Sequence, residues 1–275
     1  MIKLIAIILI AYSALCLGMF LFQRRIVFRP EIAIMNPHDF KLDSASRLSL
    51  ETTDSVKLTA WYIAPKGTGY PTMVYFHGNK GHIGDRAEKL RAFSQLGLGI
   101  LAISYRGYGD SKGTPTEQGL YEDGRAALRY LIHNLALPLD HIVIYGESLG
   151  SGVAVHMATE FPVKAIMLEA PYSSILDLAH ENYPFIPTSL LLRDKFLSIR
   201  KIRSVHAPLL IMHGAEDQTI PIKFGKELYG VANEPKKAVF FDHYHHTDFE
   251  IGVLATCVKQ FLQHYKALPE DTIQP

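Results

Sequence analysis

The sequence predicts an α/β fold in which a mostly parallel β-sheet is covered by helices on both faces. Short apolar runs alternate with longer stretches of helical character along most of the chain. The apolar runs are continuous rather than alternating, which is typical of strands buried on both faces of a parallel sheet. Residues 171–207 interrupt this alternation, because no strand-like run occurs in them. An excursion of that length is usually functional, such as a lid over a site.

Each element is predicted from its local pattern. Residues 56–63 alternate between polar and apolar side chains and predict an antiparallel strand. The buried strands are expected at residues 72–76, 98–105, 141–145, 163–169, 208–212 and 237–241. Helices are expected at residues 83–96, 149–161 and 222–229. Two further helices open on capping boxes, one at Thr114-Pro115-Thr116-Glu117 that runs to about residue 135 and one at Thr247-Asp248-Phe249-Glu250 that runs to about residue 267.

The N-terminus differs from the rest of the chain. Residues 4–22 contain no charged side chain and span about 28 Å as a helix, close to the thickness of a bilayer core of roughly 30 Å. We therefore predict a single-pass membrane anchor over residues 1–25. A cleaved signal peptide is the alternative, but only Lys3 precedes the apolar run, and small-residue cleavage sites are weak. Arginines follow the run at positions 24, 25 and 29, so the positive-inside rule leans only slightly toward a cytoplasmic domain.

The composition excludes several classes of protein. Lys and Arg number 28 and Asp and Glu 27, so the net charge is +1, and the chain lacks the basic surplus of a nucleic-acid-binding domain. The two cysteines, Cys16 and Cys257, suggest neither a disulfide framework nor a cysteine metal site. Hydrophobic residues make up 48% of the chain, enough for one large core. Residues 269–275 are polar and are expected to be a frayed tail.

The most informative motif is Gly146-Glu147-Ser148-Leu149-Gly150, which lies between a predicted strand and a predicted helix. A strand, a sharp turn and a helix form the context of a nucleophile elbow. Glycines are needed there because a Cβ atom at Gly146 or Gly150 would clash where strand and helix approach. The turn exposes the Ser148 hydroxyl and leaves the Leu149 amide free to bind a developing negative charge. The alternative is a glycine-rich turn with a capping serine.

A serine nucleophile needs a base and a carboxylate that orients the base. Glu216 and Asp217 both follow the strand predicted at residues 208–212, where the carboxylate is expected. Either side chain satisfies the order along the chain.

Three histidines follow the last predicted strand. His246 is the predicted base because it directly precedes Thr247, the expected N-cap of the last helix. His245 and His243 are the alternatives, and they otherwise fit solvated surface residues. A metal site made of these histidines and Asp242 is a further possibility that the loop spacing permits.

A second amide is expected to complete an oxyanion hole. His77-Gly78-Asn79 follows the strand at residues 72–76, and the glycine lets the backbone turn the Asn79 amide inward. His77 is expected to be structural, because it comes before the base in chain order. Asp110, in the turn after the next strand, is expected to be structural as well.

The insertion at residues 171–207 is rich in large apolar side chains. Tyr183, Phe185, Leu190 and Leu191 are predicted to line or cover an acyl-binding site as the wall of a lid. The alternative is that the segment forms helices that pack against the core.

These motifs together resemble the alpha/beta-hydrolase superfamily. The resemblance is greatest to N-terminally anchored serine hydrolases labelled serine-aminopeptidase-like, a subgroup that includes eukaryotic protein depalmitoylases. The matching pieces are Gln23-Arg24-Arg25, His77-Gly78-Asn79, Tyr105-Arg106-Gly107-Tyr108-Gly109, Gly146-Glu147-Ser148-Leu149-Gly150, His213-Gly214-x-x-Asp217 and His246-x-Asp248. The resemblance implies an alpha/beta-hydrolase fold over residues 26–268 with Ser148 as nucleophile, Asp217 as the acid and His246 as the base. The family usually has asparagine where this chain has Thr247.

The predicted function is that of a membrane-anchored serine hydrolase, an esterase or thioesterase. It would cleave carboxylic esters or thioesters of a small-molecule or lipid-like acyl substrate through an acyl-enzyme, with no cofactor and no metal. A peptide or amide hydrolase is one alternative. The other is a non-catalytic, membrane-tethered binding domain on the same fold.

Overall fold

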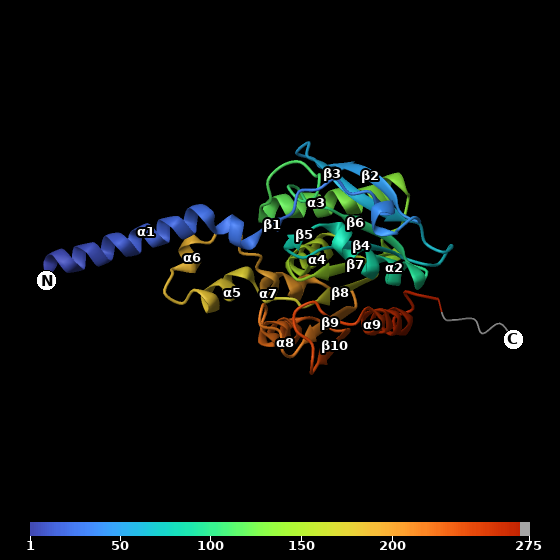
Figure 1. The fold of residues 1–275 in the computed structure, drawn as a ribbon. Helices are drawn as coiled ribbons and strands as arrows, with labels where there is room; N and C mark the ends of the chain where they lie inside the picture. The colour runs from blue at the N-terminus through green and yellow to red at the C-terminus, as the bar shows by residue number, and fades with distance from the viewer. Residues whose placement is uncertain (270–275) are drawn as a thin grey trace.

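An eight-stranded sheet forms the centre of the molecule, in the order β10-β9-β8-β7-β4-β6-β3-β2. The five pairs from β10 to β6 are parallel, whereas β3 pairs antiparallel with β6 and with β2. The computed structural model describes residues 1–269. Helices cover both faces of this mostly parallel sheet (Figure 1), which confirms the predicted fold class.

The bounds of the elements are as follows. The strands are β1 Arg29–Pro30, β2 Ser46–Glu51, β3 Lys57–Ile63, β4 Thr72–Phe76, β5 Lys80–Gly81, β6 Gly99–Ile103, β7 Ile142–Glu147, β8 Ala165–Glu169, β9 Leu209–Gly214 and β10 Lys236–Phe241. The helices are α1 Ile2–Val27, α2 Ala87–Gln95, α3 Glu117–Arg129, α4 Leu149–Glu160, α5 Ile175–Asn182, α6 Thr188–Leu191, α7 Ser198–Lys201, α8 Ile222–Val231 and α9 Ile251–His264. Short 3-10 or π turns are η1 Pro37–Phe40, η2 Ile83–Arg86, η3 Tyr130–Asn134, η4 Leu139–His141 and η5 Ile202–Ser204.

The hydrophobic core has two halves, one on each face of the sheet. Along β4, Val74 and Phe76 contribute to one half, and Met73 and Tyr75 to the other, because side chains alternate along a strand. Buried residues of α3, α4 and α8 complete the first half, and those of α2 and α9 complete the second. Because the strands from β10 to β6 run parallel, their carboxyl ends meet at one edge of the sheet, which is where open α/β sheets bind ligands.

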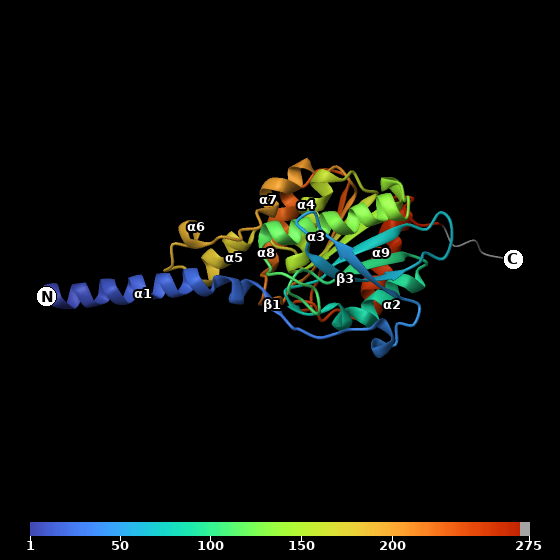
Figure 2. The same cartoon turned by 90° about the horizontal axis from the view of Figure 1, so that it is seen from above.

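Helix α1 projects from the domain and carries the N-terminus away from the sheet (Figures 1 and 2). It is long and apolar enough to cross a membrane by length and composition. The helix continues to Val27, two residues past the expected end of the anchor, and Gln23 is its buried residue. Helices α5 and α6 lie beside α1 in both views, although they come from the middle of the chain.

The insertion at residues 171–207, all of them described, contains helices and no strand, as predicted. Its two halves differ in position. Phe196 and Ile202 are buried in the core beside α4, as the packing alternative expects. The first half, with α5 and α6, lies along α1 instead.

Several sequence-based boundaries are wrong. The N-cap of α3 is Thr116, whose hydroxyl accepts from the Gly119 amide at 2.9 Å, so Thr114 caps nothing and α3 begins two residues later than the predicted box. Helix α9 begins at Ile251 with no side-chain cap, so the capping box at Thr247 does not form. The strands β1, β2 and β5 were not expected. The predicted tail falls mostly on residues 270–275, which lie outside the described residues.

Candidate active site

The strand, turn and helix at Ser148 occur as predicted. Strand β7 ends at Glu147, α4 begins at Leu149, and Ser148 has φ +51° and ψ −116° between them. A left-handed φ is strained for a residue with a Cβ atom, and such strain persists only where the surroundings enforce it. Both glycines are required by space. A Cβ at Gly146 would lie 2.6 Å from the Gly150 oxygen, and one at Gly150 would lie 2.1 Å from the Phe76 oxygen.

Two hydrogen bonds join Ser148 to residues from the ends of two later strands. The Ser148 Oγ lies 2.8 Å from His246 Nε2. The His246 Nδ1 lies 2.7 Å from Asp217 Oδ2. The structure thus brings together the serine, histidine and aspartate that the sequence singled out.

Asp217 is held as a buried carboxylate. Its Oδ1 accepts from the amides of Thr219 and Ile220, each at 2.8 Å, and His213 Nε2 lies 3.2 Å from its Oδ2. Burial by itself would raise the pKa of Asp217, but the hydrogen bonds from His213 and His246 outweigh it and hold the pKa below its usual value. Asp217 is therefore ionised and oriented toward His246.

The neighbouring candidates lie at the surface. Glu216 is half exposed and faces His243 and His245 at 3.7 and 3.8 Å. The His245 amide donates to Asp248 Oδ1 at 2.9 Å, which closes the loop that was expected to be a helix start. Neither histidine contacts Ser148.

Among the described residues, the loop histidines do not form a metal-binding group. The side chains whose ligand atoms lie close enough to share one ion are Glu31, His82 and Asp85. The Asp85 carboxylate already accepts from the His82 amide at 2.9 Å and from the Arg86 guanidinium at 3.4 Å. This group therefore has a structural explanation in the turn that begins η2.

The loop after β4 is fixed on three sides at Asn79. The Asn79 Nδ2 donates to Val27 O at 3.1 Å, and Asn79 O accepts from the Arg29 amide and the Tyr108 hydroxyl at 2.9 Å each. Tyr108 belongs to the motif Tyr105-Arg106-Gly107-Tyr108-Gly109. His77 is fully buried next to it, and burial lowers its pKa to about 3, so the ring is neutral.

Two cavities meet at Ser148 and share Arg29, Asn79 and Thr219 as further lining residues. The first, of about 200 Å³, is lined largely by apolar side chains that include Ile26, Val27 and Ile175, and we call it the inner cavity. The second, of about 530 Å³, is lined by charged residues and by His246, and we call it the polar cavity. A linear substrate bound at Ser148 could therefore place an apolar part on one side and a polar part on the other.

Comparisons with known proteins agree with this architecture. A family model described as the alpha/beta hydrolase fold matches residues 71–196. The uncharacterised protein Rv2307c of Mycobacterium tuberculosis is 34% identical over 262 residues, which cover 94% of this chain and 93% of that protein. Protein bem46 of Schizosaccharomyces pombe is 31% identical over 217 residues, with 74% of this chain and 71% of that protein covered. The chain belongs to the alpha/beta-hydrolase family.

A solved structure of similar shape is the Pyrococcus furiosus esterase Pf2001, with a TM-score of 0.71 and 20% sequence identity. The alignment covers 86% of this alpha/beta hydrolase and 99% of that protein. At this identity the likeness shows the fold alone.

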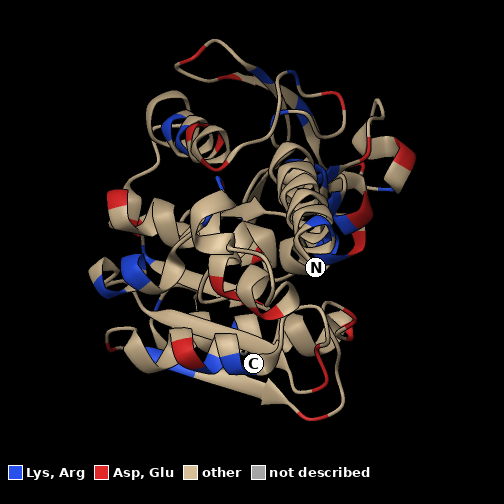
Figure 3. Ribbon diagram, turned by 90° about the vertical axis from the view of Figure 1, so that its left-hand side faces the viewer, with Lys and Arg blue, Asp and Glu red and all other residues tan. Residues whose placement is uncertain are grey.

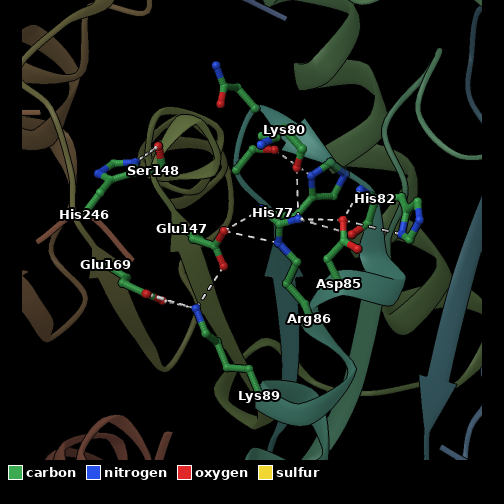
Figure 4. A network of polar contacts seen from close by, with 12 residues as sticks. His77, Lys80, His82, Asp85, Arg86, Lys89, Glu147, Ser148, Glu169 and His246 are labelled. Atoms are coloured by element: carbon green, nitrogen blue, oxygen red, sulfur yellow. Dashed lines mark hydrogen bonds and ion pairs between the residues drawn. The ribbon is translucent and has the colours of Figure 1, made fainter. Parts of the chain in front are cut away.

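Lys89, Glu147 and Glu169 are buried beneath the elbow of this hydrolase and are paired with one another and with the partly buried Arg86 (Figure 4), and we call these four residues the buried charge cluster. Lys89 Nζ lies 2.9 Å from Glu147 Oε2 and 2.7 Å from Glu169 Oε2. Arg86 Nη2 donates to Glu147 Oε1 at 2.8 Å, and its Nη1 donates to Lys80 O at 2.9 Å. The Ser148 amide in turn donates to Glu169 O at 2.9 Å. The cluster therefore ties the residue before Ser148 to the loop that carries Asn79.

The two carboxylates of this cluster differ in their surroundings. Burial would raise both pKa values, but Lys89 and Arg86 together hold the pKa of Glu147 well below its usual value. Within residues 1–269, Lys89 is the only cation paired with Glu169, and burial and the Glu147 charge leave the pKa of Glu169 raised. The sequence carried a signal for one member of this cluster, because Glu169 ends the buried, apolar run of β8. Lys89 carried no such signal, because it lies among other charged residues, next to Glu88 and close to Arg91.

The predicted lid residues divide into two pairs. Tyr183 lines the inner cavity. Leu191 lines an adjoining cavity of about 70 Å³ between α1 and the insertion, which we call the anchor cavity. The prediction that Phe185 and Leu190 wall the site is wrong, because they are 85% and 81% exposed and line neither cavity.

Proposed function

We propose that this alpha/beta hydrolase is a membrane-anchored serine hydrolase that cleaves carboxylic esters or thioesters through an acyl-enzyme. The observation that carries the proposal is the hydrogen-bonded chain from Ser148 through His246 to Asp217, with the serine on a strained turn between two cavities. In this arrangement the Ser148 hydroxyl has His246 within reach as a base, and Asp217 orients that base.

In the proposed mechanism, His246 Nε2 accepts the Ser148 proton while Oγ attacks the carbonyl carbon. Asp217 accepts a hydrogen bond from Nδ1, which fixes the tautomer and stabilises the imidazolium. The amides of Leu149 and Asn79 are proposed to bind the oxyanion. Leu149 is the first residue of α4, where amides have no partner within the helix, and Asn79 lines both cavities.

Collapse of the tetrahedral intermediate then breaks the bond to the leaving group, which receives the proton from His246. Water attacks the acyl-enzyme with His246 again as the base and regenerates the Ser148 hydroxyl. We assign the inner cavity to the acyl part and the polar cavity to the leaving group. The apolar lining of the first and the charged lining of the second support this assignment.

The membrane anchor is part of the proposal. It is supported by the 26-residue helix α1. The most apolar 18-residue stretch of this helix has a mean hydropathy of 2.6, and none of that stretch is buried against the protein. Apolar side chains exposed along a whole helix are favourable in a bilayer and unfavourable in water.

A fluorophosphonate probe tests the proposed nucleophile. The full chain, reconstituted in vesicles, should be labelled, and Ser148→Ala should abolish both labelling and hydrolysis of a panel of esters. Ser151→Ala is a matched control, because Ser151 is also buried near the start of α4 but makes no hydrogen bond to His246. Absence of labelling in the wild-type protein would favour the non-catalytic binding domain. Labelling with turnover of amides only would favour the peptidase alternative.

A further inference from the structure

We propose that residues 183–192 form a re-entrant segment that enters the same bilayer leaflet as the second half of α1. We further propose that acyl chains pass from that leaflet to Ser148 between this segment and α1. The first part rests on the proposed membrane anchor, and the second part also rests on the proposed hydrolase function.

The re-entrant segment has the composition of a membrane-facing element. Its sequence, Tyr-Pro-Phe-Ile-Pro-Thr-Ser-Leu-Leu-Leu, contains no charged residue, and it is bounded by Glu181 on one side and Arg193 on the other. Phe185 and Leu190 are 85% and 81% exposed. Exposed large apolar side chains that lie together indicate an interaction surface rather than a surface facing water. In Figure 3, which views the molecule from the α1 end, the charged segments lie around the domain, and most of α1 is free of them.

The depth of the segment follows from its contact with α1. The Tyr12 hydroxyl donates to Phe185 O at 2.8 Å. Tyr12 lies eleven residues before Gln23, which corresponds to about 16 Å along a helix, or about half of a 30 Å hydrocarbon core. With the last turn of α1 at the membrane surface, the tip of the re-entrant segment therefore reaches well into one leaflet.

A segment at that depth must satisfy its backbone polar groups without water. The Ile186 amide donates to Tyr183 O at 3.0 Å, and the Leu192 amide donates to Thr188 O at 2.9 Å. The amides of Leu190 and Leu191 both donate to Pro187 O, at 3.0 and 3.1 Å. The two prolines of the segment, at positions 184 and 187, carry no amide hydrogen. At the exposed tip, the Tyr12 hydroxyl of α1 provides a partner for the Phe185 carbonyl.

A polar collar closes the base of the segment at the level of the last turns of α1. Gln23 Nε2 donates to Leu191 O at 3.0 Å, and Gln23 Oε1 accepts from the Arg193 amide at 2.7 Å. Arg24 Nε pairs with Asp194 Oδ2 at 2.8 Å, and the Arg193 guanidinium lies 4.1 Å from the centre of the Phe20 ring. Charged groups thus appear at one level both on α1 and at the end of the re-entrant segment, as expected at a membrane surface.

The path to Ser148 starts inside this collar. The anchor cavity and the inner cavity are adjacent, because they share Ile26, Val27, Ile175, Ala179 and Tyr183 as lining residues. Met19, on α1, lines the anchor cavity, and Ser148 lines the inner cavity. An acyl chain can therefore leave the leaflet along α1 and reach the serine through two adjacent cavities that are lined mostly by apolar side chains.

Depth-dependent fluorescence quenching tests the insertion. The full-length chain with Phe185→Trp is placed in phosphatidylcholine vesicles whose acyl chains carry bromine, and the signal of wild-type protein corrects for the buried Trp61. The control is Thr68→Trp, in the exposed loop between β3 and β4. Lys66 and Tyr70, on either side of Thr68, line a cavity together with Leu268. This loop lies far from α1 in Figure 1. Strong quenching at position 185 with none at position 68 is expected. Equal quenching at both positions would overturn the insertion. This measurement needs no catalytic activity, so it stands even if the proposed function fails.

Turnover tests the route. The double variant Phe185→Ser, Leu190→Ser should hydrolyse a long-chain ester embedded in vesicles at least about fivefold more slowly, because two apolar contacts with lipid are lost. Its labelling by fluorophosphonate and its turnover of a water-soluble acetyl ester should stay within about twofold of wild type. The matched control is Ile32→Ser, Ile34→Ser, which removes two equally exposed apolar side chains outside the segment and should change neither rate. Equal losses on both esters, or no loss on either, would overturn the route.

Discussion

Removal of Lys89 from the buried charge cluster should destabilise the protein strongly and in a pH-dependent way. In Lys89→Met, Glu147 keeps Arg86 as its partner, but Glu169 keeps only the Tyr145 hydroxyl, at 2.5 Å. Two carboxylates that face each other in a dry interior cannot both stay ionised. Glu169 is then expected to fold as the neutral acid.

The size of the effect follows from the proton that Glu169 must bind. With an unfolded pKa of about 4.3 and about 1.36 kcal/mol per pH unit, neutralisation costs about 4 kcal/mol at pH 7 and about 1 kcal/mol at pH 5. The first value lies within the range of about 3–5 kcal/mol known for breaking a buried ion pair. Because the folded pKa of Glu169 is raised in the variant, the variant's relative stability is retained at low pH and lost as the pH rises toward that value. At neutral pH the melting temperature should fall by roughly 6–20 °C.

Urea unfolding of the detergent-solubilised full chain at pH 5 and pH 7 measures this effect. Lys66→Met is the matched control, because Lys66 is exposed on a loop, and it should cost less than about 0.5 kcal/mol at both pH values. Adding Glu169→Gln to Lys89→Met should recover stability at pH 7 and abolish the difference between the two pH values. A loss below about 1 kcal/mol at pH 7 with no pH dependence would refute the reasoning.

Three further predictions concern the site and its surroundings. Asp217→Asn should retain the fold and lose about 10³–10⁴ in turnover through the wrong tautomer of His246, whereas Glu216→Gln should cost less than about tenfold; similar losses in both would refute the assignment of the acid. Leu191→Asp should slow hydrolysis of long acyl esters more than acetyl esters, which parallel assays on both would measure. His77→Gln removes a buried neutral ring whose pKa is near 3. The wild type loses stability between about pH 6.5 and pH 3, because this ring binds a proton more readily in the unfolded chain. The stability of the variant, measured in urea titrations, should therefore fall less steeply over the same range.

The parts of the fold that the sequence predicted are those governed by local pattern. The elbow at Ser148 was predictable because glycine spacing, a strand and a helix occur within one short stretch. The sequence could place Asp217 and His246 near Ser148, because both residues follow strands of a parallel sheet and the carboxyl ends of such strands meet at one edge. The two capping boxes failed for a reason of the same local kind. Several nearby side chains compete for one amide, and Asp248 binds the His245 amide instead of supporting a cap at Thr247.

The parts that could not be predicted depend on contacts between distant segments. Strands β1 and β5 have two residues each and pair only because α1 delivers Arg29 to the loop after β4. The pairing of Lys89 with Glu169 spans 80 positions in the sequence, and that of Arg24 with Asp194 spans 170. A charged residue within an apolar run indicates that some partner exists. It does not indicate which partner, because that depends on the packing of whole elements.

The short junction between α1 and the domain has a consequence for how substrate is found. Helix α1 ends at Val27 and β1 begins at Arg29, and the single residue between them, Phe28, is buried against the core. A flexible linker of ten residues would let a domain move about 18 Å away from its anchor. The junction at Phe28 is too short and too well packed to allow such a displacement. With α1 in a bilayer as proposed, Ser148 stays at one height above the lipid surface. Encounter then becomes a two-dimensional search, so the rate should follow the surface density of substrate in the membrane rather than its concentration in bulk water.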